Sequence, residues 1–169
     1  MGNYSFVPVL ETVRCSLYRV MYGDFKEVCS LYEDEEVREY MGGVITGHLA
    51  SRRFNQMVNS MYPSHYWSIR RKECGRWMGI IFLEWEEAGD CLKLGYMLSP
   101  AYWGYGYATE VCSAVLDFGF DELLFKEIGA VVNNSNRRSI NVLRKLGMSC
   151  AVKDLSEGQS KYAIRKSIL

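Results

Sequence analysis

The spacing of apolar residues predicts two amphipathic helices in the first part of the chain. Apolar side chains that recur every three or four positions share one face of a helix. Such spacing predicts a helix over residues 24–37, with Asp24 as its N-cap. Its apolar face comprises Phe25, Val28, Leu31 and Tyr32. A second helix is expected over residues 48–61, closed by Pro63. The apolar face of this second helix comprises Leu49, Phe54, Met57 and Met61.

Shorter stretches rich in β-branched and aromatic residues predict strands. These stretches are residues 13–20, 65–70, 76–85, 91–98, 126–132, 148–154 and 161–169. A turn signal separates 76–85 from 91–98, so these two strands should form an antiparallel hairpin. Further helices are expected at 106–123 and 136–147. The resulting order, β-α-α-β-β-β-α-β-α-β-β, predicts an α/β (α+β) fold with a mixed sheet rather than a regular βαβ alternation.

The composition indicates an ordinary globular domain and narrows the range of partners. The 169 residues are 49% apolar and 24% charged, which suits a single domain with a substantial core. Twenty basic residues balance twenty acidic ones, so no net charge attracts nucleic acid or an anionic membrane. No stretch is apolar over the roughly 20 residues that a spanning helix needs. The first residues also lack the pattern of a signal peptide.

Cysteine and histidine usage predicts a cytoplasmic protein without a metal site. The six cysteines are scattered and form no CxxC pair, so we expect reduced and mostly buried thiols. His48 and His65 lie far from each other and from any cysteine pair. Zinc ligation is therefore not expected.

The stretch SPAYWGYGYATE, residues 99–110, predicts a glycine-rich turn that opens a helix. Glycines at 104 and 106 let a ligand approach the backbone, and free amides at a helix N-terminus bind phosphate without a cationic side chain. A tight turn without a ligand explains the same glycines equally well. A P-loop is excluded because Tyr107 and Ala108 replace its lysine and hydroxyl residue. A dinucleotide-binding fingerprint is excluded because Thr109 replaces its third glycine.

Two motifs together resemble a known family. The run LGYMLSPAYWGYGYATEV at 94–111 is followed, about forty residues further on, by NRRSINVLRKLGM at 136–148. This pair resembles the GNAT superfamily of acetyltransferases, and within it the RimJ/RimL-type ribosomal-protein N-acetyltransferases. The likeness runs from about Leu10 to the C-terminus, with a motif core at about 91–148. It implies one GNAT-like domain over 1–169, with a mixed, mostly antiparallel sheet of about seven strands, about four helices and a splayed central strand pair.

The resemblance also implies acetyl-CoA as the co-substrate and assigns residues to it. Trp103, Gly106 and Ala108 align with the family's acetyl-CoA loop, and Trp103 agrees with the RimJ/RimL branch rather than with the wider family. Tyr105 stands where that branch commonly has Lys, Arg or Gln. Asn136 matches the asparagine that contacts the CoA arm. The implied cofactor-binding residues are Met97, Leu98, Trp103, Gly104, Tyr105, Gly106, Tyr107, Ala108, Thr109, Asn136 and Ser139.

The catalytic residues are less clearly marked than the cofactor loop. Many GNAT enzymes have a tyrosine acid seven residues after the asparagine, but Leu143 stands there, so the resemblance points to Ser139. A first-turn serine without a catalytic role is the alternative, and Asn136 is also an expected helix N-cap. Glu84 is the candidate base, with a solvent-facing carboxylate as the alternative. The branch often has Glu where this chain has Lys93.

We therefore expect a cytoplasmic enzyme that transfers an acetyl group from acetyl-CoA to a primary amine. The amine attacks directly in a ternary complex, and the RimJ/RimL likeness implies a protein N-terminal α-amine as acceptor. Two alternatives stay open. The acceptor could be a small amine such as a polyamine or aminoglycoside, or the chain could be a non-catalytic acetyl-CoA-binding module. The superfamily includes both monomers and homodimers, so either state is compatible with the sequence.

Overall fold

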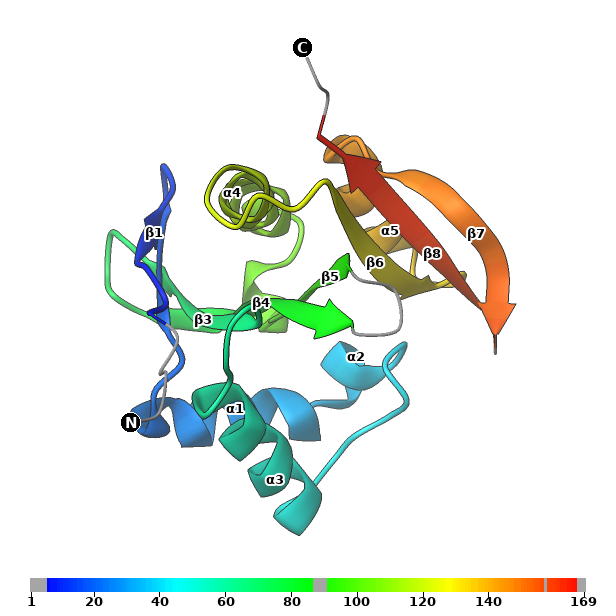
Figure 1. Cartoon of the computed structure of the whole chain (residues 1–169). Coiled ribbons are helices and arrows are strands. Elements are labelled where there is room, and N and C mark those ends of the chain that lie inside the picture. The colour runs from blue at the N-terminus through cyan, green and yellow to red at the C-terminus, as the bar shows by residue number, and fades with distance from the viewer. Residues whose placement is uncertain (1–5, 87–90, 157, 167–169) are drawn as a thin grey trace.

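A single mixed sheet organises the chain (Figure 1). The computed structural model describes residues 6–86, 91–156 and 158–166. Eight strands lie in the order β1-β2-β3-β4-β5-β6-β8-β7, and every neighbouring pair is antiparallel except β5 and β6. The strands are β1 (Leu10–Glu11), β2 (Cys15–Arg19), β3 (His65–Arg71), β4 (Trp77–Glu86), β5 (Cys91–Leu98), β6 (Glu127–Asn133), β7 (Ser149–Ser156) and β8 (Gln159–Arg165).

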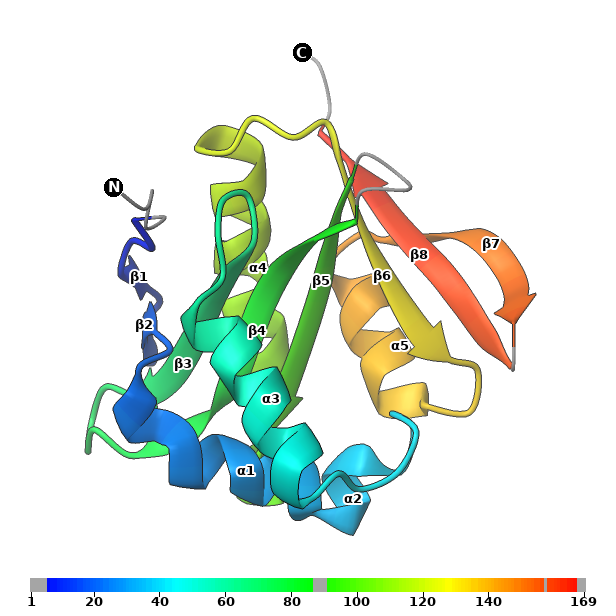
Figure 2. The ribbon, with the colours of Figure 1, turned by 60° about the horizontal axis from the view of Figure 1, so that its bottom comes forward.

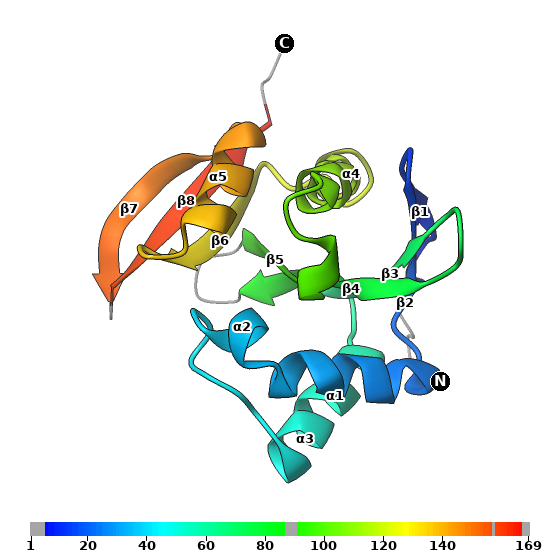
Figure 3. The same ribbon diagram turned by 180° about the vertical axis from the view of Figure 1, so that it is seen from behind.

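Helices cover both faces of this sheet, as Figure 3 shows from behind. One face carries α1 (Phe25–Glu33), α2 (Glu35–Arg38) and α3 (Gly47–Val58), and the other carries α4 (Tyr107–Asp121) and α5 (Arg137–Lys145). Alternation along the strands supplies a core to each side. On β4, Ile81 and Leu83 pack with the α4 core, whereas Ile80 packs with the core under α1 and α3. Among the described residues, no helix is long and apolar enough to span a membrane.

The predicted class and the β4–β5 hairpin are confirmed, but the element count differs. The structure adds the two-residue strand β1, and the helix expected over 24–37 is divided in two. Asp34 adopts an extended conformation between the halves, and its carboxylate accepts a hydrogen bond from the Val37 amide at 3.0 Å. Asp34 therefore caps a new helix, a local competition that apolar spacing does not reveal. Of the last strand expected, residues 167–169 lie outside the described part.

The apolar face expected for the second helix was partly wrong. Leu49 and Met61 are 46% and 69% exposed. Ala50 and Val58 are buried in their place, together with the expected pair Phe54 and Met57. The helix ends at Val58, before Met61 is reached. The cysteine expectation is also only half right, because all six thiols are free but three of them are buried: Cys15, Cys91 and Cys112.

The splayed strand pair is present at β5 and β6 (Figure 2). These parallel strands pair only through Leu92 with Ile128 and Lys93 with Gly129. Beyond Lys93 the two strands separate, although β5 stays paired to β4 as far as Leu98. The sheet therefore opens beside the second half of β5.

Candidate active site

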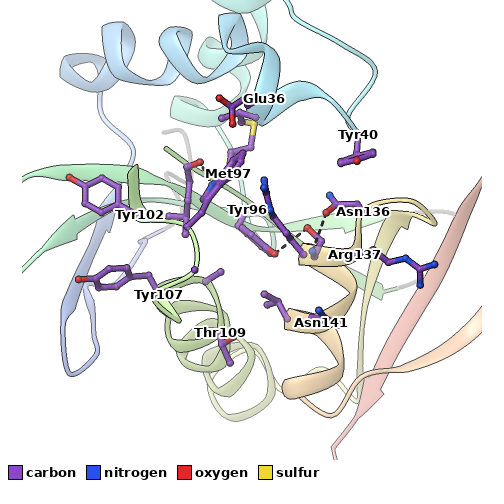
Figure 4. Close-up of a pocket in the computed structure, with 18 of the residues that line it drawn as sticks. Glu36, Tyr40, Tyr96, Met97, Tyr102, Tyr107, Thr109, Asn136, Arg137 and Asn141 are labelled. Carbon is purple, nitrogen blue, oxygen red and sulfur yellow. Dashed lines mark hydrogen bonds between the residues drawn. The ribbon is translucent and has the colours of Figure 1, made fainter. Parts of the chain in front are cut away.

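A cavity of about 500 Å³ lies where β5 and β6 separate (Figure 4). The second half of β5, the N-termini of α4 and α5, and the α2 segment supply its walls. Most residues that the resemblance assigns to acetyl-CoA meet here. They are Met97, Leu98, Trp103, Gly104, Gly106, Tyr107, Ala108, Thr109, Asn136 and Ser139. Tyr105 and Glu84 do not line the cavity.

The glycine-rich turn forms one end of the cavity. Gly104 and Gly106 have φ values of +83° and +82°, a region that residues with a Cβ rarely adopt. Gly106 is the N-cap of α4, and no side chain caps this helix end. The first amides of a helix lack an intrahelical acceptor and lie at the positive end of its dipole. Amides that point into a cavity from such a turn suit a pyrophosphate.

A cross-fold contact holds this turn from the side of β2. The Arg14 guanidinium donates to the Tyr105 carbonyl at 3.0 Å and lies 4.1 Å from the centre of the Tyr107 ring. Glu110, in the first turn of α4, accepts hydrogen bonds from the Arg14 amide at 2.7 Å, from Arg14 Nε at 2.6 Å and from the Thr12 hydroxyl at 2.6 Å. No sequence motif indicates this contact, because Arg14 and Glu110 lie 96 residues apart. The side chain of Tyr105 is 67% exposed.

Trp103 bridges the end of β5 and the first turn of α5. Its indole Nε1–H donates to the Leu98 carbonyl at 2.8 Å. The Arg138 guanidinium, which lines the cavity from α5, lies 4.6 Å from the centre of the indole ring. An arginine over an aromatic face is attracted by the quadrupole of the ring. Trp103 thus fixes the end of β5 and one side of α5 around the cavity.

Asn136 and Ser139 begin α5. The Asn136 side chain accepts the Ser139 amide at 3.1 Å, so the predicted N-cap is confirmed. The Ser139 Oγ accepts a hydrogen bond from the Tyr96 hydroxyl at 3.2 Å, and both residues line the cavity. Burial raises the pKa of Tyr96, so the phenol is protonated at neutral pH. Leu143, 3% exposed, belongs to the core and does not line the cavity.

Sequence reasoning did not single out Tyr96. The residue belongs to the quoted LGYML segment, and alternation along β5 places it on the same face as Leu94 and Leu98, toward α4 and α5. That alternation was a usable signal for its direction. Its meeting with Ser139 was not readable, because the two residues are 43 positions apart.

The structure does not bring Glu84 into the cavity. Its carboxylate accepts the Tyr66 hydroxyl at 2.7 Å and lies 3.5 Å from the Lys93 ammonium. Burial, followed by the hydrogen bond to Glu84, raises the pKa of Tyr66. Glu84 is thus engaged in a polar contact on β4, and its role as a base remains a prediction.

Two carboxylates lie on the α2 side of the cavity, which Arg137 and Arg138 of α5 also line. Glu36 and Glu39 line it from α2 and the residue that follows, next to Tyr40 and Met41. The buried Arg38 guanidinium fixes this segment by donating to the Gly43 carbonyl at 2.8 Å. Figure 4 places Tyr96 between Glu36 and Tyr40 on one side and Thr109 and Asn141 on the other. The part of the chain that the structure describes contains no group of three or more His, Cys, Asp or Glu residues that could hold a metal ion.

Comparison with known proteins finds a matching family model and several related sequences. The sequence model of the family described as an acetyltransferase (GNAT) domain matches residues 14–149. An uncharacterized protein of Bacillus subtilis (strain 168), YkkB, is 31% identical over 122 residues, which is 70% of this chain and 71% of that protein. Spermidine N(1)-acetyltransferase of Escherichia coli (strain K12) is 34% identical over 76 residues, 43% of this chain and 41% of that enzyme.

Two solved structures share the fold over nearly their whole length. An acetyltransferase from Agrobacterium tumefaciens str. C58 superposes with a TM-score of 0.85 at 21% identity, covering 98% of this chain and 99% of that one. Ribosomal-protein-S5-alanine acetyltransferase from Vibrio fischeri gives a TM-score of 0.75 at 15% identity, covering 94% and 96%. The domain predicted from the two motifs is thereby confirmed as a GNAT-like fold.

Proposed function

The chain belongs to the GNAT acetyltransferase family, and we propose that it acetylates the N-terminal α-amine of a protein. The observation that carries this proposal is the single cavity that joins the glycine-rich turn to Ser139 and continues to the α2 segment. One ligand can reach the turn while a second reaches Ser139 from the α2 end. The WGYGYAT sequence at 103–109 and the fold shared with ribosomal-protein-S5-alanine acetyltransferase support a protein N-terminus as acceptor.

The residues present suit acetyl-CoA at the turn end. When bound, acetyl-CoA supplies a thioester whose carbonyl carbon forms a C–N bond with an attacking amine. The C–S bond breaks and its electron pair stays on sulfur. One proton leaves the nitrogen, and one reaches the sulfur. The amides from Gly104 to Thr109 would bind the pyrophosphate. The backbone near Met97 and Leu98 would bind the pantetheine arm like an added strand. Holding both reactants in one cavity supplies much of the rate enhancement.

Two proton movements fall to side chains of this chain. Ser139 would donate its hydroxyl proton toward the departing sulfur from the first turn of α5. A base is needed because an amine is mostly protonated at neutral pH. We propose Glu84 as the base, acting through a water molecule. Glu36 and Glu39, the carboxylates that line the cavity, serve as the controls for this assignment. Glu84→Gln should lower kcat more than either Glu36→Gln or Glu39→Gln if this assignment holds.

A small cationic amine is a second candidate acceptor, because the α2 end of the cavity carries Glu36 and Glu39. Carboxylates attract the additional charges of a polyamine. The partial likeness to a spermidine N(1)-acetyltransferase supports this alternative. Glu36→Gln and Glu39→Gln would then raise KM for spermidine. They would leave KM nearly unchanged for an N-terminal peptide whose side chains carry no charge.

One experiment separates these proposals. The purified chain is titrated calorimetrically with acetyl-CoA and with CoA, and thiol release is measured over N-terminal peptides, polyamines and aminoglycosides. Binding with thiol release from peptides supports the first proposal, and release from polyamines alone supports the second. Binding without release from any amine would favour a non-catalytic acetyl-CoA-binding module. Failure to bind either nucleotide would refute the assignment of residues 99–110 as a pyrophosphate site.

A further inference from the structure

A hydrogen-bonded tyrosine–serine pair lies midway along the cavity. Tyr96 on β5 donates its phenolic hydrogen to Ser139 Oγ on α5 at 3.2 Å, across the opening between β5 and β6 (Figure 4). We propose that Tyr96 is a positioning residue that directs the Ser139 hydroxyl proton into the cavity. This inference rests on the proposed function, in which Ser139 donates toward the departing sulfur.

The donors and acceptors around Ser139 support this role. A serine hydroxyl has one proton to donate and two lone pairs to accept with. Here the Ser139 amide is satisfied by the Asn136 side chain, and one lone pair of Oγ is filled by Tyr96. With Tyr96 as the donor in this pair, no protein group within residues 6–86, 91–156 and 158–166 accepts the Ser139 hydroxyl proton. That proton is therefore free to be donated to a group bound in the cavity.

The environment of Tyr96 makes it a persistent donor. The ring packs against the core between the sheet and α4, which fixes the direction of its hydroxyl. Burial raises the pKa of this phenol, so it keeps its proton near neutral pH and stays able to donate. A hydroxyl that accepts one hydrogen bond also becomes a better donor, because successive hydrogen bonds polarise one another.

The position of the pair fits this role better than a purely structural one. A hydrogen bond that only joined β5 to α5 could lie anywhere along the contact between them, yet this one lines the cavity. It also stands where β5 and β6 have already separated, three residues beyond the last β5–β6 pair at Lys93. Leu143, at the place of the expected tyrosine acid, is buried away from the cavity. Tyr96 therefore supplies a phenol to the same site from a different element.

The test uses variants that keep the packing. Tyr96→Phe removes the hydroxyl and keeps the ring, Ser139→Ala removes the proposed donor, and Ser139→Thr restores a hydroxyl. Tyr162→Phe is the matched control, since Tyr162 is 8% exposed in the same core but does not line the cavity. Melting temperature verifies that each variant folds. The double variant Tyr96→Phe/Ser139→Ala shows whether the two residues act as one unit.

The first measurement needs no acceptor. Affinities for CoA and for desulfo-CoA, which lacks the sulfur, are measured calorimetrically at pH 9, where part of the thiol is ionised. Loss of a hydrogen bond to a charged group weakens binding by about tenfold, so Ser139→Ala should bind CoA about tenfold less tightly. Tyr96→Phe should weaken CoA binding by at least about threefold. Neither variant should change the affinity for desulfo-CoA.

The second measurement is kinetic, with the best amine from the thiol-release screen. Both single variants should lower kcat by about 10- to 100-fold with little change in KM for acetyl-CoA. The double variant should be no slower than Ser139→Ala alone, and Ser139→Thr should recover part of the rate. A multiplicative loss in the double variant would overturn the inference, because Tyr96 would then act independently of Ser139.

The outcomes separate this inference from the function on which it rests. If Ser139→Ala weakens CoA binding but Tyr96→Phe behaves like Tyr162→Phe, the positioning role of Tyr96 is refuted and the role of Ser139 stands. If Ser139→Ala leaves CoA affinity and kcat unchanged, the proposed donor itself fails. Equal losses for CoA and desulfo-CoA would mean that the pair shapes the cavity rather than contacting the sulfur, which also overturns the inference.

Discussion

Glu110 joins the start of β2 to the first turn of α4, and replacing it by glutamine tests whether this contact holds the glycine-rich turn. The carboxylate accepts hydrogen bonds from the Thr12 hydroxyl, the Arg14 amide and Arg14 Nε. A glutamine has nearly the same shape, but its NH₂ group faces the Arg14 guanidinium as a second donor. Arg14 would then hold the Tyr105 carbonyl less firmly.

The size of the effect follows from these contacts. Thr12 and the Arg14 amide both donate to Oε1, an oxygen that glutamine retains, so these two hydrogen bonds persist and lose only their charge assistance, about 0.5 kcal/mol in all. The ion pair counts at no more than about 0.5 kcal/mol, because the Arg14 side chain is 41% exposed and screened by water. We therefore expect Glu110→Gln to lower the free energy of unfolding by about 1 kcal/mol. For a chain of this size that is about 2–4 °C in melting temperature.

The stability difference should also depend on pH. Burial opposes ionisation of Glu110, but the hydrogen bonds from Thr12 and Arg14 outweigh it and hold the pKa of this carboxyl below its usual range. A group with a lowered pKa in the folded state stabilises the fold above its unfolded pKa, about 4.3, and that stabilisation is lost as the pH falls through the folded value. The gap between wild type and Glu110→Gln should be constant from pH 8 to pH 5 and should shrink on further acidification.

Urea unfolding at several pH values measures this gap, and calorimetry with CoA measures its effect on the turn. Glu122→Gln is the control, since Glu122 is exposed just beyond α4. We expect Glu110→Gln to weaken CoA binding several-fold and the control to change neither quantity. Equal stability of Glu110→Gln and wild type at pH 7 would refute this estimate of the energy of the contact. A stability loss with unchanged CoA affinity would refute the idea that this contact orders the turn.

Three further substitutions, one of them with a matched control, test separate parts of the fold. Gly106→Ala should cost about 1–2 kcal/mol of stability and weaken CoA binding, because the φ of Gly106 is +82°. The control Gly75→Ala, at φ +66° in the β3–β4 turn, should cost a similar amount in urea unfolding without changing CoA affinity. Gly119→Ala should destabilise by about 1–3 kcal/mol in the same assay, since its Cβ would lie 2.6 Å from Ile128 Cδ1 between α4 and the sheet, and unchanged stability would contradict that packing. Asp34→Ala should remove the cap of α2 at a cost of about 1 kcal/mol and raise KM for the acceptor more than KM for acetyl-CoA.

Local features of this fold were readable from the sequence. The glycines at 104 and 106, the Asn136 cap and the β4–β5 hairpin depend on backbone conformations within a few residues, so short motifs determine them. The family resemblance also predicted the splayed strands, because two motifs about forty residues apart had the expected order. The spacing of apolar residues predicted one continuous helix where Asp34 ends α1 and caps α2.

By itself, the sequence determined the class of fold, the glycine-rich turn and most of the residues that line the cavity beside this turn. Only the tertiary structure decided which side chains meet. It paired Arg14 with Glu110 and Tyr96 with Ser139, and it placed Glu84 outside the cavity. Backbone conformation at a turn or cap is set by neighbouring residues. Contacts between distant side chains depend on strand register and on how each helix packs against the sheet, and both are properties of the whole fold.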